Sequence, residues 1–239
     1  FYYLIMNNQI ICIEDKLPLA MVVIFFIMVF LVRDGTKYEN FTTFSKTQNL
    51  GKEEGEIFKQ GLNKDAKIVY SKLSKIDFPN VDESKKEVNK ILEYQSKNDL
   101  HDHKVQALKQ LDFADDFNRL KVSFKDRRNL MKYIHEYADP ITMKLKVHYD
   151  RIRPSKFDKR VKEIIKLPDH PSYPSGHACQ SYSIAYLLSL KYPKNEKFYL
   201  NYAKSVSENR EIMGLHYPSD SEYGRKIAEE MVKLSGYRL

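Results

Sequence analysis

Apolar residues recur at helical spacing through most of the chain after residue 62. Ile141, Leu145 and Tyr149, for example, repeat every four residues and so lie on one face of a helix. The same pattern predicts helices over residues 64–76, 83–97, 102–120, 126–138, 141–151, 175–191, 195–213 and 218–235, with one short helix near 159–166. No convincing strand alternation or internal repeat is present, so the sequence predicts an all-α helical bundle. Residues 154–174 carry four of the nine prolines and predict a loop-rich stretch.

The N-terminal part of the chain has a different pattern. Residues 17–32 are an unbroken apolar run, which as a helix would be roughly 24 Å long against a hydrocarbon core of roughly 30 Å. No small-residue cleavage site follows, because the next residues are Arg33, Asp34 and Gly35. We therefore expect a single N-terminal hydrophobic helix acting as a signal anchor over residues 1–33, with a cleaved signal peptide as the alternative.

The segment that follows looks like a tether. Residues 34–61 combine glycines with polar residues, which predicts a linker between the anchor and one catalytic domain over residues 62–239. We expect association with a membrane through residues 17–32, or export. Charges of both signs flank the apolar run and leave its orientation open.

The amino-acid composition indicates which chemical classes of binding partner the protein favours. The net charge of +8 over 239 residues suits anionic partners such as phosphate esters. No homeodomain, zinc-finger or RNP-type pattern supports nucleic acid. The two cysteines, Cys12 and Cys179, lie on opposite sides of the apolar run and make no disulfide framework. Nothing in the sequence indicates the oligomeric state.

Three short segments carry the candidate chemistry. Lys146 and Arg153 are seven residues apart, so they can share one helical face, and Arg210 adds a third cation from a distant segment. Three converging cations suit a phosphoryl group, whose oxygens stay charged through transfer. Between them, Ser175-Gly176-His177 opens an apolar helix, whose free N–H groups can bind an anion. Taken singly, each of these residues is more typical of a surface cation or a helix cap.

His216 and Asp220 form the third segment, four residues apart with Pro218 between them. Asp220 can accept a hydrogen bond from one imidazole nitrogen, which fixes the tautomer and leaves the other nitrogen nucleophilic. A structural His–Asp pair at a helix start is the alternative interpretation of this pair alone.

Together these motifs resemble the signature of the PAP2 (type 2 phosphatidic acid phosphatase) and vanadium haloperoxidase superfamily: K-x6-R-P, P-S-G-H and S-R-x5-H-x3-D. The matching positions are Lys146, Arg153, Pro154, Pro174, Ser175, Gly176, His177, Arg210, His216 and Asp220. Asn209 stands where the family usually has Ser, which puts the contribution of that side chain in doubt. Spacing and order match throughout residues 146–220.

The resemblance implies a PAP2/haloperoxidase-like fold and a role for each matched residue. Lys146, Arg153 and Arg210 resemble the phosphate-binding cations, and Ser175 and Gly176 resemble the oxyanion contacts beside them. His216, oriented by Asp220, resembles the nucleophile that forms a phosphohistidine, and His177 resembles the acid that protonates the leaving group. No metal and no cofactor is implied. His177 must start protonated and His216 neutral, which predicts a bell-shaped pH profile with an optimum below neutrality.

Within this superfamily, the class A non-specific acid phosphatases are the better match in chain length and in the sequence of the motif segments. We therefore expect a metal-independent phosphomonoester hydrolase acting on a small phosphate ester. The alternatives are a vanadium-dependent haloperoxidase and a lipid-phosphate phosphatase tethered to a membrane. A non-catalytic anion-binding protein is disfavoured, since both histidines and Asp220 are present.

Other polar residues are assigned no catalytic role. His101, Asp102 and His103 are expected in a solvated turn, and Asp112, Asp115 and Asp116 on a charged helix face. His135 and Glu136 are interpreted as helix residues without a role, and Cys179 as buried packing. His148, His170 and Tyr173 are candidates for shaping the pocket.

Overall fold

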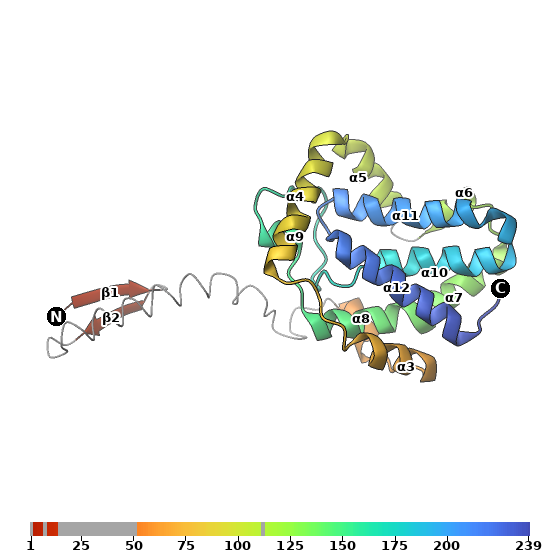
Figure 1. Ribbon diagram of the computed structural model, residues 1–239, viewed down its shortest axis with the longest axis horizontal. Coiled ribbons are helices and arrows are strands. Elements are labelled where there is room, and N and C mark those ends of the chain that lie inside the picture. The colour runs from red at the N-terminus through yellow and green to blue at the C-terminus, as the bar shows by residue number, and fades with distance from the viewer. Residues whose placement is uncertain (1, 7–8, 14–51, 111–112) are drawn as a thin grey trace. The chain divides into compact units, whose positions relative to one another are not determined.

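The computed structural model describes residues 2–6, 9–13, 52–110 and 113–239 (Figure 1). The chain divides into two compact units, Phe1–Phe41 and Thr42–Leu239. The expected N-terminal hydrophobic helix, residues 17–32, lies outside the described residues. None of the helices within the described ranges has both the length and the apolar character that a membrane crossing requires.

The first unit holds a β-hairpin that the hydrophobic pattern did not predict. Strands β1 (Tyr2–Met6) and β2 (Gln9–Ile13) pair antiparallel, with Tyr2 opposite Ile13 and Met6 opposite Gln9. Both strands are almost continuously apolar and rich in aromatic or β-branched residues, which favours strands without producing an alternating pattern. The all-α prediction is therefore wrong for residues 2–6 and 9–13.

Every regular element that the structure describes in the second unit is a helix. Its elements are α2 (Lys52–Lys59), α3 (Lys64–Leu73), α4 (Val81–Lys97), α5 (Leu100–Lys109), α6 (Ala114–Arg119), α7 (Phe124–Tyr133), the π-helix η1 (Ile134–Ala138), α8 (Asp139–Tyr149), α9 (Pro154–Phe157), α10 (Gly176–Lys191), the 3-10 turn η2 (Pro193–Asn195), α11 (Glu196–Ile212) and α12 (Pro218–Ser235). The all-α prediction is confirmed for this unit.

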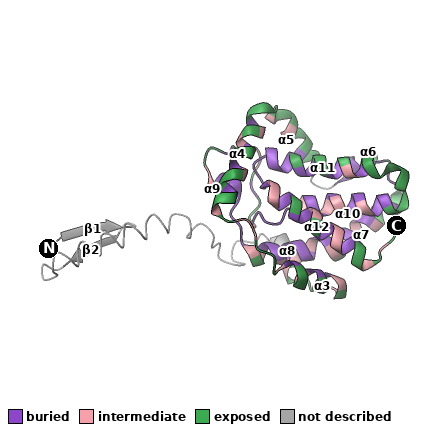
Figure 2. Ribbon diagram, viewed as in Figure 1, coloured by how far each residue is buried: buried purple, intermediate pink, exposed green. Residues whose placement is uncertain are grey.

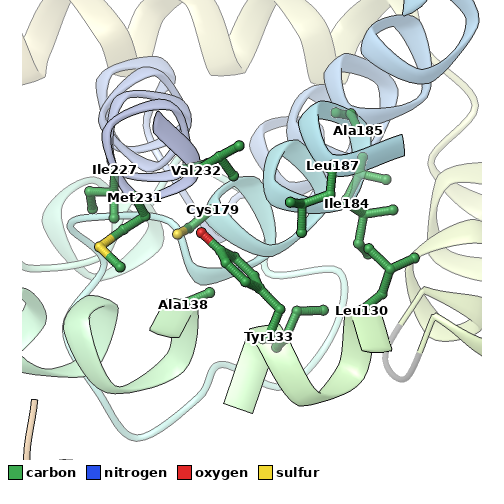
Figure 3. Close-up of a cluster of buried hydrophobic side chains, with 14 of the residues drawn as sticks. Leu130, Tyr133, Ala138, Cys179, Ile184, Ala185, Leu187, Ile227, Met231 and Val232 are labelled. Atoms are coloured by element: carbon green, nitrogen blue, oxygen red, sulfur yellow. The ribbon is translucent and has the colours of Figure 1, made fainter. Parts of the chain in front are cut away.

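Helix α10 is the centre of this unit. It packs along α11 and α12, as Figure 1 shows, and its residues are apolar on most sides. Figure 2 shows it mostly in the colour of buried residues, and Figure 3 shows Ile184 and Leu187 facing Leu130 while Cys179 meets Tyr133. A helix that is apolar nearly all round must be surrounded by other elements. The core thus fixes α10, and with it the start of α10, where Ser175, Gly176 and His177 lie.

Three predicted elements differ from the structure. The helix expected over 102–120 is two helices, α5 and α6, because Phe113 adopts a left-handed conformation (φ 61°) that buries its ring. No helix spans 159–166. Instead, the Gln95 side-chain amide donates to the Lys162 carbonyl and accepts from the Lys162 N–H, each at 2.9 Å. Residues expected to be linker include α2, whose Phe58 ring lies 4.1 Å from Lys144 Nζ.

Candidate active site

Five of the eight predicted site residues line one cavity of about 540 Å³ in the helical unit, whereas Arg153, Ser175 and Asp220 are not among its lining residues. Lys146 reaches it from α8, Gly176 and His177 from the start of α10, Arg210 from α11, and His216 from the loop before α12. His135 and Lys166 also line the cavity and are exposed, so they mark where it opens to solvent. The remaining wall is largely apolar and includes Ile57, Phe113, Met131, Ile134, Met143, Ile165 and Leu215.

Lys146 and Arg153 are buried cations held by backbone oxygens. Lys146 Nζ donates to the carbonyls of Pro171 (2.9 Å) and Ser172 (3.1 Å). Arg153 donates from Nη1 to the Leu215 carbonyl at 2.7 Å and from Nε to the His170 carbonyl at 3.2 Å. The loop between α9 and α10 is thereby fastened to both cations, and His170, a predicted pocket residue, does line the cavity.

Arg210 is fully buried and only partly satisfied. Its Nη2 donates to the carbonyls of Ala107 and Gln110, both at 3.2 Å, near the end of α5. Its Nε and Nη1 are buried without a hydrogen-bond partner. Since a buried unpaired donor costs about 1–3 kcal/mol, these two nitrogens are suited to an anion that enters the cavity.

The start of α10 contributes the next part. The Ser175 side chain caps the helix by accepting from the Ala178 N–H at 3.3 Å, and the Ser175 N–H donates to the Asp220 carbonyl at 2.9 Å. His177 Nε2 is buried without a partner. A Cβ atom on Gly224 would lie 2.5 Å from the Ser175 carbonyl, so only glycine lets α12 cross so close to this turn.

His216 and Asp220 form the pair that the sequence predicted. His216 Nδ1 lies 3.2 Å from Asp220 Oδ2, which also accepts from the Tyr217 N–H at 3.0 Å. Asp220 is completely buried and His216 is 4% exposed. The contact occupies one imidazole nitrogen with a carboxylate, the arrangement that fixes a tautomer.

Two residues that no motif predicted, Arg151 and Glu87, complete the surroundings of Asp220. Arg151 Nη1 donates to Asp220 Oδ1 at 2.6 Å, and its Nη2 donates to Glu87 Oε2 at 2.8 Å. Arg151 lies in the first motif, two residues before Arg153, yet its residue type alone is equally typical of a surface cation. Glu87 lies on α4 without any local sequence signal, so only the fold reveals the contact.

Burial dominates the electrostatics. It lowers the pKa of Lys146 well below its ordinary value, with the neighbouring Arg153 as the second cause. Burial also lowers the pKa of Arg153 and that of Arg210 to about 10. The pKa values of His177 and His216 fall well below 6.5, first through burial and then through the surrounding cations and, for His177, His216. Burial thus disfavours the protonated forms of these groups, and a bound anion would favour them.

Several residues that were assigned no catalytic role lie elsewhere than expected. His103 is in α5, not in a turn, and its Nδ1 lies 2.8 Å from the Asn209 side chain. Asp116 is buried and accepts from the Tyr202 hydroxyl at 3.1 Å, so it is not on a solvated face. His135, which the sequence gave no role, lines the cavity.

The remaining candidates lie near the site without lining it. The His148 Nε2 atom bonds the Ser74 carbonyl at 2.9 Å, and Tyr173 stacks on Tyr223 with ring centroids 4.7 Å apart. Neither is among the cavity-lining residues. Cys179 is buried and free, as predicted, and its thiol pKa is raised by burial to about 12.

The chain is similar to known proteins over part of its length. A non-specific acid phosphatase from Providencia stuartii is 33% identical over 107 residues, which is 43% of this chain and 43% of that enzyme. The chain thus spans less than half the length of this curated relative. The crystal structure of a bacterial vanadium-dependent iodoperoxidase matches with a TM-score of 0.38 and 15% identity over 75% of this chain and 48% of that one, a score too low to carry an argument.

The PAP2 superfamily matches residues 137–234. This range begins in η1, continues through α8 and ends within α12, and it contains all eight predicted site residues. The motifs, their convergence on one cavity and the sequence matches agree. Residues 137–234 of this chain therefore match the PAP2 superfamily in both sequence and motif order.

Proposed function

We propose that this protein is a metal-independent phosphomonoester hydrolase that acts through a phosphohistidine on His216. The observation that carries the proposal is Arg210, which lines the cavity with two buried nitrogens that have no partner. A phosphoryl group offers the anionic oxygens that these donors lack. The identity to an acid phosphatase over 107 residues supports the same reaction class.

The cations would hold the phosphoryl group. Arg210 and Lys146 line the cavity, and Arg153 is bonded to His170 and Leu215 of its wall. Their positive charge would stabilise the oxygens through transfer, the task that Mg²⁺ performs in other phosphoryl-transfer enzymes. The N–H groups at the start of α10 would add donors to the same anion.

The two histidines would divide the chemistry. When the Nδ1–H of His216 donates a hydrogen bond to Asp220, Nε2 carries the lone pair. That lone pair attacks phosphorus while the P–O bond to the leaving group breaks. His177 gives its proton to the departing oxygen. It then takes a proton from water, whose oxygen displaces His216 and releases inorganic phosphate. Each step conserves charge and needs no other reactant than water.

Hydrolysis of p-nitrophenyl phosphate by the full chain, from pH 4 to 8 in excess EDTA, tests the proposal. We expect turnover in the wild type and its loss in His216→Ala, with unchanged turnover in the control His101→Ala, an exposed residue of α5. Quenching in alkaline denaturant, in which the P–N bond of a phosphohistidine is stable, should trap phosphate on His216. A wild type without activity at any pH would refute the proposal, and turnover of bromide with peroxide and vanadate would then favour the haloperoxidase alternative.

We propose further that residues 17–32 hold the enzyme at a membrane. Their unbroken apolar sequence supports this. Flotation of the full chain with phosphatidylcholine vesicles, compared with a chain lacking residues 17–32, is the measurement. Equal flotation of both chains would refute it.

A further inference from the structure

A chain of alternating charges runs outward from the nucleophilic histidine. His216 Nδ1 meets Asp220 Oδ2 at 3.2 Å, and the other oxygen of Asp220 accepts from Arg151 Nη1 at 2.6 Å. The second terminal nitrogen of Arg151 donates to Glu87 Oε2 at 2.8 Å. The side chains of Arg151, Asp220 and Glu87 are 3%, 0% and 12% exposed, so these contacts are shielded from solvent.

The guanidinium in this chain is fixed by more than its two carboxylates. Its carbon lies 3.7 Å from the centre of the Tyr217 ring, a stacked arrangement that favours a planar cation. Nη1 also donates to Ser219 Oγ at 2.7 Å, and Nη2 donates to Ser84 Oγ at 2.8 Å. Arg151 therefore has one position, and Asp220 Oδ1 is held against it.

Glu87 closes the arrangement. Its Oε1 accepts from the Ser219 N–H at 2.7 Å, and its Oε2 accepts from the Ser219 hydroxyl at 2.8 Å. Ser219 is in the first turn of α12, next to Asp220. Glu87 thus holds the turn that carries Asp220 as well as the arginine that binds it.

Arg151 does not line the cavity, although Lys146 and Arg210 do. Its contacts all point to Asp220 and Glu87 or to hydroxyl groups and rings around them. It therefore has no direct access to a bound phosphoryl group, and any effect on the reaction must pass through Asp220.

We propose, on the basis of the function proposed above, that Arg151 and Glu87 are positioning residues that keep Asp220 Oδ2 on His216 Nδ1. They hold the imidazole in the tautomer that leaves Nε2 free for attack. Glu87 has a second task that follows from charge. Asp220 and Arg151 alone would sum to zero, whereas the triad with Glu87 keeps one net negative charge beside the imidazole. That charge stabilises the positive ring that forms when His216 attacks phosphorus.

Kinetics of full-chain variants test the proposal with p-nitrophenyl phosphate. Arg151→Lys keeps the charge but loses the fork that spans both carboxylates, and Glu87→Gln removes the second carboxylate in similar volume. We expect kcat to fall about 10- to 100-fold, as is typical when a partner that orients a reactive ligand is lost, while KM changes less than about threefold. Arg160→Gln, at an exposed pair with Asp158, should leave both constants unchanged.

A double-mutant cycle separates positioning from a general structural effect. If Arg151 acts through Asp220, adding Arg151→Lys to Asp220→Asn should lower kcat by less than about twofold further. Multiplicative losses, with the full effect of Arg151→Lys retained in the Asp220→Asn background, would overturn the proposal.

A measurement without turnover keeps this inference separate from the proposed function. In ¹⁵N-histidine spectra of the full chain, which has seven histidines, His216→Ala identifies the His216 signals. We expect the Nδ1–H tautomer in the wild type and a mixture of tautomers in Glu87→Gln and Arg151→Lys. An inactive wild type would refute the hydrolase alone, whereas an unchanged tautomer in both variants would overturn the role of Arg151 and Glu87.

Discussion

Two arginines are buried beside the same catalytic candidates, and each has a buried nitrogen without a hydrogen-bond partner, yet their charged surroundings differ. Arg151 bonds two carboxylates and stacks on Tyr217, and those carboxylates raise its pKa against the effect of burial. Arg210 has carbonyl partners on one nitrogen and none on the other two, and burial lowers its pKa to about 10. Asp116 raises the pKa of Arg210 in part but forms no ion pair with it among the described residues. A buried cation in direct ion pairs with two carboxylates belongs to the framework, whereas one without a direct ion pair can accept an anionic ligand.

The largest expected effect is on activity at Arg210. Arg210→Met should lower kcat/KM for p-nitrophenyl phosphate about 10²- to 10³-fold, because donors to the developing charge are lost. Its free energy of unfolding should stay the same or rise, since an incompletely paired buried cation is removed.

Inorganic phosphate supplies the control for Arg210. It should raise the Tm of the wild type, because it binds the native state alone, and should have much less effect on Arg210→Met. A stability loss as large as that from breaking a buried ion pair would contradict the difference drawn between the two arginines.

The next largest effect is on stability at Arg151. Arg151→Met leaves Asp220 and Glu87 buried without their cation, so we expect about 3–5 kcal/mol less free energy of unfolding, measured by urea denaturation. Arg160→Met, at an exposed ion pair, should change it by less than about 0.5 kcal/mol. Equal effects of the two substitutions would show that the buried contacts add nothing.

The pH dependence should reveal the positive potential around Arg210. Burial, then Arg210 and His216, lowers the pKa of His177 in the empty site. As the pH rises, His177 therefore loses its proton before pH 6.5, and kcat/KM should decline there because the general acid is no longer protonated. A bound phosphate dianion favours protonation, so the basic limb of kcat should lie at higher pH than that of kcat/KM. Coincident limbs in the two profiles would contradict this account.

The smallest effect is expected at Asn209, which precedes Arg210 on α11. Its side chain is buried between Gln110 and His103, and Asn209 is not among the cavity-lining residues. Asn209→Ser removes contacts that brace α5 without touching the groups proposed to bind phosphate. We expect kcat/KM to change by less than about threefold, corresponding to under about 1 kcal/mol, whereas a loss comparable to Arg210→Met would place Asn209 in the site.

The difference between Arg151 and Arg210 also explains what could be predicted from the sequence. Arg210, His177 and His216 have unusual chemistry at fixed spacing, so their convergence could be expected from the motifs alone. Arg151 and Glu87 are common residue types, and their pairing depends on where α4 crosses the start of α12. Neither the hydrophobic periodicity nor the spacing of the motifs predicts where these two helices cross.

The helices show the same division. The long apolar run of α10 and the amphipathic pattern of α12 predicted both helices within about one residue of their observed bounds. The break at Phe113 and the irregular backbone at Lys162 were missed, because both depend on distant contacts that override local preference. The α2 wall of the cavity was missed for the same reason, since Ile57 lies in a segment whose composition is that of a linker.

The close crossing of α12 over the start of α10 divides the positions around the site into those that tolerate substitution and those that do not. Gly224 and the bond from Ser175 to the Asp220 carbonyl make this crossing intolerant of any larger residue. Ile57, Met131 and Met143 belong to other helices and line the cavity without taking part in the crossing. Directed evolution of substrate range can therefore vary these wall residues, because the crossing of α12 and α10 that positions the proposed reacting groups does not involve them.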